Sequence, residues 1–346
     1  MGNFVLDQFL DYVPSFMNTR IVLTSNLDPW RNLAMEEYLL DNVKQNECIL
    51  YLWQNQNTVV IGKNQNAWKE CRTELLEQEG GKLARRSSGG GAVFHDTGNL
   101  NFSFLVDRQF YDVHKQLEVI LKAVEKLGIK AVFSGRNDLT VEGRKFSGNA
   151  FCFRKKSALH HGTILISADM EKMTRYLQVP KEKIRSKGIE SVRSRVVNLT
   201  EYNPNIDVPI MIDTLIQSFK EVYGETSDIR YGEEGIDQAV LNELHNKYKS
   251  WEWRFGESPK FDIEFDTRFS WGGIQLCLRL EQGRIVKAFV YSDAMDEAFI
   301  EMIPGILEGC IFNSKKMAQV LLSADVVGER TNMVRDIANW ISSKGF

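Results

Sequence analysis

The amino-acid sequence predicts an α+β protein, with a large domain built on a mixed, mostly antiparallel sheet followed by a small α+β domain. Short apolar runs joined by tight polar turns indicate neighbouring antiparallel strands, as in residues 48–53 and 58–61. Strands outnumber helices in the first part and do not alternate with them, which disfavours a βαβ array. The 346 residues exceed one small domain. The composition changes after Tyr248, so we expect a domain boundary near residue 250.

The first part of the chain is predicted to begin with a short strand, at residues 20–23, and a long amphipathic helix. Apolar residues recur at helical spacing across residues 30–43, directly after candidate N-caps beside Pro29. Residues 82–86 are predicted as a strand that enters a glycine run. Residues 100–106 alternate polar and apolar side chains, which predicts a half-buried strand.

The rest of the chain is predicted as hairpins, helices and a second group of strands. Residues 139–141 and 145–153 form a predicted hairpin, because Gly143 in the turn between them can adopt a positive φ. A further strand at residues 158–165 pairs next. Helical spacing predicts helices at residues 111–127, 170–177, 210–223 and 235–247. Beyond residue 250 we expect strands at 261–265, 274–281 and 285–291, a helix from Glu297 that ends before Pro304, and a terminal helix.

The overall composition is that of an ordinary globular protein, 43% hydrophobic and 26% charged. A formal net charge of −3 provides no basic field for bulk nucleic-acid binding. The five cysteines are scattered and form no CxxC pair, so we expect neither zinc nor disulfides, and a reducing compartment. No apolar run is long enough to span a membrane, and residues 1–16 lack Lys and Arg, so we expect a cytoplasmic protein without a targeting peptide.

The stretch LARRSSGGGAVFHDTGN, residues 83–99, places two arginines and three consecutive glycines before a predicted strand. Glycines expose backbone N–H groups that can wrap a phosphate, and Arg86 offers a planar fork suited to phosphate oxygens. The stretch is neither a Walker loop nor a GxGxxG turn that opens a helix. On composition alone, a glycine-rich hairpin with a surface arginine remains the alternative.

A second group of polar residues lies on the predicted hairpin. Strand alternation predicts that Lys145, Ser147 and Asn149 share one face. A lysine within an apolar sheet is costly unless it meets an anion. Asp138 is a candidate ligand for Mg²⁺, which prefers carboxylate and phosphate oxygens. The alternatives are an exposed strand face for Lys145 and a simple turn residue for Asp138.

Two further features carry charge or titratable groups. His160 and His161 are adjacent on a predicted strand, so they point to opposite faces and cannot easily share a metal ion. One of them is a candidate to line a site while the other packs. Basic residues are concentrated in residues 181–195, which predicts a loop that closes over an anionic ligand, a docking face for an acidic partner or nucleic acid, or a solvated loop.

Taken together, these motifs resemble the lipoate–protein ligase A family of the bacterial type, which has a C-terminal accessory domain. The resemblance begins at Met17 and runs through LDPWRNLAMEE, LWQNQNTVVIGKNQNAWKEC, LARRSSGGGAVFHDTGN, SGRNDL, RKFSGNAF, HHGTIL, KGIESVRSRVVNLTE and WEWRFGESPKF. It implies the catalytic fold shared by biotin and lipoate ligases over residues 17–250. It also implies an accessory domain over residues 251–346 and leaves residues 1–16 as an N-terminal extension.

The resemblance implies that the protein uses lipoate, ATP and Mg²⁺ to form lipoyl-AMP. The lipoyl group then passes to a lysine of an apo lipoyl domain, either in a 2-oxoacid dehydrogenase complex or in the glycine cleavage H protein. Lys145 matches the family's catalytic lysine, which contacts the acyl carbonyl and the α-phosphate, and the 181–195 loop resembles the segment that folds over the adenylate. The implied contacts are Arg86, Gly91, Ala92, Val93, Phe94 and Lys145 for ATP; Lys145, Arg86, Ser88, Gly91, His95 and His161 for lipoate; and Asp138 and Asn137 for Mg²⁺.

Two other functions stay open on the sequence alone. One is a transferase that uses only preformed lipoyl-AMP or octanoyl-AMP, and the other is a non-catalytic regulator that binds the adenylate. Related octanoyltransferases use a cysteine nucleophile, and Cys152 lies near the predicted site in the sequence. We expect Cys152 to be a packing residue, because an adenylate needs no enzyme nucleophile. No nucleic-acid or membrane partner is expected.

Overall fold

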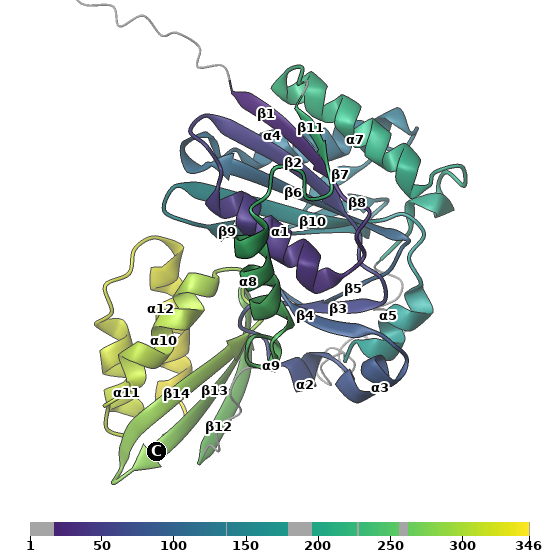
Figure 1. Cartoon of the computed structure of the whole chain (residues 1–346). Coiled ribbons are helices and arrows are strands. Elements are labelled where there is room, and N and C mark those ends of the chain that lie inside the picture. The colour runs from purple at the N-terminus through teal and green to yellow at the C-terminus, as the bar shows by residue number, and fades with distance from the viewer. Residues whose placement is uncertain (1–16, 136, 179–195, 227, 256–261, 346) are drawn as a thin grey trace, which may run out of the picture.

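The computed structural model describes residues 17–135, 137–178, 196–226, 228–255 and 262–345 (Figure 1). Its main feature is an eight-stranded sheet in the order β11-β1-β2-β6-β10-β9-β8-β7. Strand β1 runs parallel to both β2 and β11, and every other pair is antiparallel. The mixed, mostly antiparallel fold predicted from the sequence is therefore confirmed. The strands are β1 (Asn18–Leu23), β2 (Glu47–Trp53), β6 (Asn99–Asp107), β7 (Val132–Ser134), β8 (Asp138–Val141), β9 (Arg144–Phe153), β10 (Ser157–Leu165) and β11 (Ile229–Tyr231).

A second, three-stranded sheet in the order β4-β3-β5 carries the glycine run between two of its strands. Strand β3 (Thr58–Ile61) pairs with β4 (Lys82–Arg85) in parallel and with β5 (Val93–His95) in antiparallel orientation. Two short helices that the sequence analysis did not predict, α2 (Ala67–Glu70) and α3 (Thr73–Gln78), pack on this sheet together with α5 (Met170–Tyr176).

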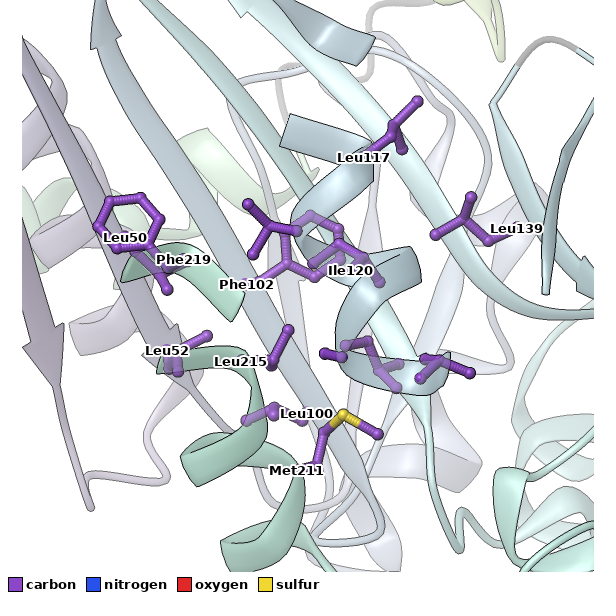
Figure 2. Packing of buried hydrophobic residues seen from close by; sticks show 14 of the residues in the cluster. Leu50, Leu52, Leu100, Phe102, Leu117, Ile120, Leu139, Met211, Leu215 and Phe219 are labelled. Atoms are coloured by element: carbon purple, nitrogen blue, oxygen red, sulfur yellow. The ribbon is translucent and has the colours of Figure 1, made fainter. Parts of the chain in front are cut away.

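Helices cover both faces of the large sheet. On one face α4 (Val113–Lys126) and α7 (Val208–Tyr223) bury an apolar cluster that includes Phe102, Ile120 and Phe219 (Figure 2). On the other face α1 (Pro29–Asp41) packs between the large sheet and the small one, beside α8 (Gln238–Lys249) (Figure 1). All of β6 is consequently buried. The prediction of a half-buried strand is wrong because α1 covers the face that carries Asn101 and Ser103.

The C-terminal part forms its own sheet and core. Strands β12 (Ile263–Phe269), β13 (Gly272–Glu281) and β14 (Arg284–Ser292) are antiparallel and pack against α10 (Glu297–Leu307), α11 (Ser314–Leu322) and α12 (Glu329–Ser342). Helix α10 continues through Pro304, so its predicted end is wrong. Proline costs that helix one backbone hydrogen bond, but Ile303 and Leu307 on either side of it are fully buried in the cluster and keep the last turn in place.

The C-terminal part contacts the glycine run directly. The Gly90 amide donates to the Ala294 carbonyl at 3.0 Å, and Lys63 pairs with Glu301 at 2.7 Å. The boundary near residue 250 stays a prediction, and the N-terminal extension 1–16 and the basic segment 181–195 lie outside the described residues. Within the described ranges, every helix is too short or too polar to cross a lipid bilayer.

Candidate active site

A cavity of about 140 Å³ lies between the large sheet and the small one. The wall from the large sheet comes from β9, β10 and β6, and the opposite wall comes from the glycine run and β5. The cavity is lined by Leu33, Trp53, Val60, Arg86, Gly90, Gly91, Ala92, Val93, His95, Asn101, Asn137, Lys145, Gly148, Asn149, Ala150, His161, Gly162, Thr163 and Met295. Most of the predicted contact residues thus meet at one place, although they come from segments far apart in the sequence.

Close approaches of the backbone explain why the loop is built from glycines. A Cβ on Gly62 would lie 2.3 Å from the Gly90 carbonyl oxygen, and one on Gly89 would lie 2.5 Å from the Ala294 carbonyl oxygen. Gly90 also has a φ of +91°, which disfavours a side chain. The glycines therefore let the loop pack tightly against β3 and the C-terminal part while its backbone lines the cavity.

Of the two consecutive arginines, only Arg86 lines the cavity. Arg85 points away and donates to carbonyl oxygens of Gly62, Lys63, Gln65, Trp253 and Arg254. These hydrogen bonds connect the small sheet to α9 (Trp251–Phe255). Burial lowers the pKa of both guanidinium groups to about 10, so both stay cationic at neutral pH.

The Arg86 side chain organises the glycine loop. Its Nη2 donates to the carbonyls of Gly89 at 2.6 Å and Gly91 at 2.8 Å, and its Nε donates to Ser88 Oγ at 3.1 Å. Nη1 donates to the Val60 carbonyl at 3.3 Å. A guanidinium has five N–H donors, so one is left without a partner in the described parts of the chain. Because Arg86 lines the cavity, this remaining donor is the candidate contact of Arg86 to a ligand.

The amine of Lys145 sits at the β9 side of the cavity. Nζ pairs with Asp138 Oδ1 at 2.7 Å, and a Cβ on Gly148 would lie 2.7 Å from Nζ. The prediction that Lys145, Ser147 and Asn149 share one face is wrong, because the β8–β9 register shifts between Leu139 and Thr140. Such a bulge inserts one extra residue into β9, so the side chains after it point to the opposite face from the one that simple alternation predicts. The Asn149 side chain instead bonds to His160 at 2.8 Å on the other face of the sheet.

His161 belongs to a buried chain of hydrogen bonds that reaches the glycine loop. Its Nδ1 lies 2.8 Å from Glu36 Oε1, and its Nε2 lies 2.7 Å from Ser88 Oγ. Glu36 Oε1 also accepts from Ser103 Oγ at 2.5 Å. Ser88 Oγ thus accepts from Arg86 Nε and lies within hydrogen-bond distance of His161 Nε2, and its hydroxyl also approaches the Gly89 carbonyl at 3.5 Å. The chain of hydrogen bonds links the buried Arg86 guanidinium to the buried carboxyl group of Glu36.

His95 lies on the opposite wall of the cavity and is almost fully buried. Its Nδ1 lies 3.1 Å from the Asn55 side-chain amide nitrogen. Burial lowers its pKa to about 3, and the positive charge of Arg86 acts in the same direction. The imidazole is therefore neutral at physiological pH.

The two residues predicted to contact Mg²⁺ lie beside the amine of Lys145. Asn137 lines the cavity, and its side-chain amide donates to the Asn149 carbonyl at 2.9 Å, while Asp138 forms the ion pair with Lys145. In the parts of the chain that the structure describes, no three His, Cys, Asp or Glu side chains are grouped to hold a metal ion.

Three of the predicted contact residues have side chains outside the cavity lining, and Asp138 is one of them. The Phe94 ring packs on Tyr176, with 5.6 Å between ring centroids, inside the core of the small sheet. Ser88 is fully buried behind the loop and bonds to His161. The sequence did not indicate that Glu36, Asn101 and Met295 belong to the site. Only Glu36 stands out in the sequence, because it is an acidic residue on the apolar face of the predicted helix.

The family model described as the lipoyl protein ligase A/B catalytic domain matches residues 28–220, which contain most of the large sheet and most of the cavity lining. This match assigns the fold and the cavity to a catalytic domain of that class. A second model, described as the bacterial lipoate protein ligase C-terminus, matches residues 258–341. The chain therefore belongs to the lipoate–protein ligase family, as its motifs predict.

Solved structures agree with this assignment. LipL1 of P. falciparum in complex with lipoate is 30% identical, with a TM-score of 0.82 over 94% of this chain and 100% of its own. A bipartite lipoate protein ligase from Thermoplasma acidophilum, studied with its E2 lipoyl domain, is 29% identical, with a TM-score of 0.62 over 71% of this chain and 100% of its own. A lipoate-protein ligase A bound with ATP is 26% identical, with a TM-score of 0.60 over 69% of this chain and 99% of its own.

Proposed function

We propose that this lipoate–protein ligase activates free lipoate with ATP and then transfers the lipoyl group to a lysine of an acceptor lipoyl domain. The observation that carries the proposal is the position of the Lys145 amine, which faces the same cavity as the glycine loop and Arg86. Lipoate is bound in the LipL1 structure and ATP in the lipoate-protein ligase A structure. Both similarities support the use of these two substrates.

In the first step, a lipoate carboxylate oxygen attacks the α-phosphorus of ATP, and pyrophosphate leaves with the electron pair of the broken P–O bond. The Lys145 ammonium brings two anions together and stabilises the charge that develops between them. A group with this role contributes on the order of 10²–10³ in rate. The free donor of Arg86 and the backbone of Gly91, Ala92, Val93 and Phe94 are the proposed contacts to the nucleotide phosphates.

The acyl chain is proposed to lie along the cavity wall formed by Leu33, Trp53, Val60 and Ala150, which is mostly apolar. Lys145, Arg86, Ser88, Gly91, His95 and His161 are the proposed polar and backbone contacts of lipoate. Ser88 acts from behind the loop, through its hydrogen bond to His161.

Mg²⁺ is the proposed metal partner of ATP, with Asp138 and Asn137 as its protein contacts. This ion is commonly held by one or two carboxylates together with substrate phosphates, and the single carboxylate of Asp138 beside the cavity fits that pattern. When bound, Mg²⁺ neutralises phosphate charge. Asp138 also holds the Lys145 amine at 2.7 Å, so it orients that cation in the absence of the ion.

In the second step, the acceptor lysine amine attacks the carbonyl carbon of lipoyl-AMP, an amide forms, and AMP leaves as the amine loses a proton. No acyl-enzyme is needed, and the only cysteine on β9 is a poor nucleophile. Cys152 is buried, and burial raises the pKa of its thiol to about 12. The proposed acceptors are lipoyl domains of 2-oxoacid dehydrogenase complexes and the glycine cleavage H protein, in the cytoplasm. The T. acidophilum ligase was studied with its E2 lipoyl domain, which supports this class of acceptor.

The decisive experiment is the intact mass of an apo lipoyl domain after incubation with the protein, lipoate and Mg-ATP, beside a parallel reaction supplied with lipoyl-AMP. A lipoyl mass shift in both reactions supports the complete ligase. A shift with lipoyl-AMP alone contradicts the activation step and leaves a transferase. No shift in either reaction, with lipoyl-AMP still bound, leaves a non-catalytic regulator.

A further inference from the structure

One end of the cavity carries buried polar groups that have no hydrogen-bond partner among the described residues. This distal end, formed by Trp53, Val60, His95 and Asn101, lies across the sheet from Lys145. Asn101 on β6 pairs with Thr163 on β10, and the Thr163 hydroxyl lies 3.4 Å from the Gly148 amide on β9, where the Lys145 amine sits. Two strand spacings amount to about 10 Å, close to the length of an extended eight-carbon acid.

The hydrogen bonds around His95 fix where its ring proton lies. Asn32 Nδ2 donates to the carbonyls of Asn26 and Gln54 and also to Asn55 Oδ1. The other atom of the Asn55 amide, Nδ2, is therefore a donor, and it faces His95 Nδ1 at 3.1 Å. Nδ1 must accept, so the proton of the neutral ring is on Nε2. Nε2 has no hydrogen-bond partner among the residues that the structure describes.

Asn101 lies on the facing strand. Its side chain shares one hydrogen bond of 2.9 Å with Asn99, and each of the two amides keeps one atom without a partner within the described ranges, Nδ2 of Asn101 and Oδ1 of Asn99. His95 and Asn101 are 97% and 99% buried. Buried donors are nearly always paired, by protein, water or ligand, so two unpaired donors in one cavity point to an acceptor on the ligand.

We propose that His95 and Asn101 select the tail of the acyl chain, and that they favour the sulfur-containing ring of lipoate over the methyl end of octanoate. The inference rests on the proposed function, in which the carboxyl group lies at Lys145 and the tail reaches the distal end. Divalent sulfur is a weak hydrogen-bond acceptor, whereas a methyl group accepts nothing. Octanoate would displace water from both donors without replacing its hydrogen bonds, which lowers affinity.

The test compares lipoate with octanoate as substrates of the full chain, by the intact mass of an apo lipoyl domain. The wild-type protein should favour lipoate in kcat/KM by about tenfold for each buried donor that octanoate leaves unpaired. His95→Phe and Asn101→Leu should each lower this preference by about tenfold. His95→Gln retains a donor and should keep most of the preference. Lys155→Ala, at an exposed position outside the cavity lining, should leave the ratio unchanged within twofold.

Calorimetric binding of free lipoate and free octanoate separates this inference from the proposed function. A binding preference for lipoate that His95→Phe lowers would support the inference even if no lipoyl transfer occurs. Equal affinity of the wild-type protein for the two acids, or an unchanged ratio in both donor-removing variants, would overturn it. Failure of the folded protein to bind either acid would overturn both the inference and the proposed function.

Discussion

His160 and His161 are neighbours on β10, yet they serve opposite faces of the sheet. His160 lies in the core, where Nδ1 bonds to Gln116 at 2.9 Å and Nε2 to Asn149 at 2.8 Å, with aromatic rings around it. His161 lies in the cavity wall and is bonded to Glu36 and Ser88. Both rings are buried and fully hydrogen-bonded, so neither property distinguishes a site residue from a packing residue. The face of the strand makes that distinction.

The partners on the two faces differ in charge. On the core face His160 is held by two neutral amides, and burial lowers its pKa to about 3. On the cavity face His161 and Ser88 connect the carboxylate of Glu36 to the guanidinium of Arg86. The histidine on the core face thus has only neutral hydrogen-bond partners. The histidine on the cavity face belongs to a hydrogen-bonded chain between a carboxyl group and a guanidinium, beside the place where phosphate is proposed to react.

The largest expected effect is on the cavity face, at Lys145. Lys145→Ala should lower lipoyl transfer by on the order of 10²–10³, because it removes the cation that stabilises developing charge. The melting temperature should change little, since the amine is partly exposed and pairs with Asp138 at the surface of the cavity. Transfer is measured by intact mass. The exposed Lys155 offers a matched control, and Lys155→Ala should transfer at the normal rate. Unchanged turnover in a stable Lys145→Ala protein would exclude the proposed role.

On the core face the expected effect is on stability. His160→Leu should lower the free energy of unfolding by about 2–4 kcal/mol, because it leaves both Gln116 and Asn149 with an unpaired buried atom. Urea denaturation measures the loss. His161→Leu should lower transfer more than stability. If the two variants lost stability and transfer activity in the same proportion, the assignment of His160 to the core and His161 to the site would be wrong.

The pH dependence of stability should also follow buried histidines. His95 and His160 have folded-state pKa values lowered to about 3 from an ordinary value of 6.5. Between those values the unfolded chain binds protons that the folded chain refuses, so stability falls as the pH decreases below 6.5. Each histidine contributes about 1 kcal/mol between pH 6.5 and 5.5, because the unfolded imidazole is already half protonated at pH 6.5. Urea midpoints at pH 6.5 and 5.5 should therefore differ strongly, and His160→Gln should remove about half of the difference. Equal slopes in the two proteins would contradict the assignment.

The patterns of strands and turns predicted the mixed fold, whereas the meeting of Lys145, Arg86 and the glycine run at one place followed only from the resemblance to the lipoate–protein ligase A family. The sequence could not reveal the bulge in β9, which depends on how β8 pairs with it and which moves Asn149 to the core face. It could not show that Arg85 fastens α9, since the carbonyls that Arg85 binds come from residues 62–65 and 253–254. Unpaired donors such as His95 Nε2 appear only once every neighbour is in place.

The smallest expected effect is a difference between substitutions at two adjacent glutamates on α1, Glu36 and Glu37. Glu36→Gln should lower kcat/KM by about tenfold, because the chain from Arg86 loses its counter-charge and His161 loses its strongest acceptor. Glu37 is the matched control: its carboxylate lies 2.7 Å from Lys247 and 3.3 Å from Arg154, away from the cavity. Glu37→Gln should reduce stability and leave transfer at the normal rate. Equal kcat/KM values for the two variants would show that the charge of Glu36 does not act on the site, and that the hydrogen-bonded chain on the cavity face is structural, like the one on the core face.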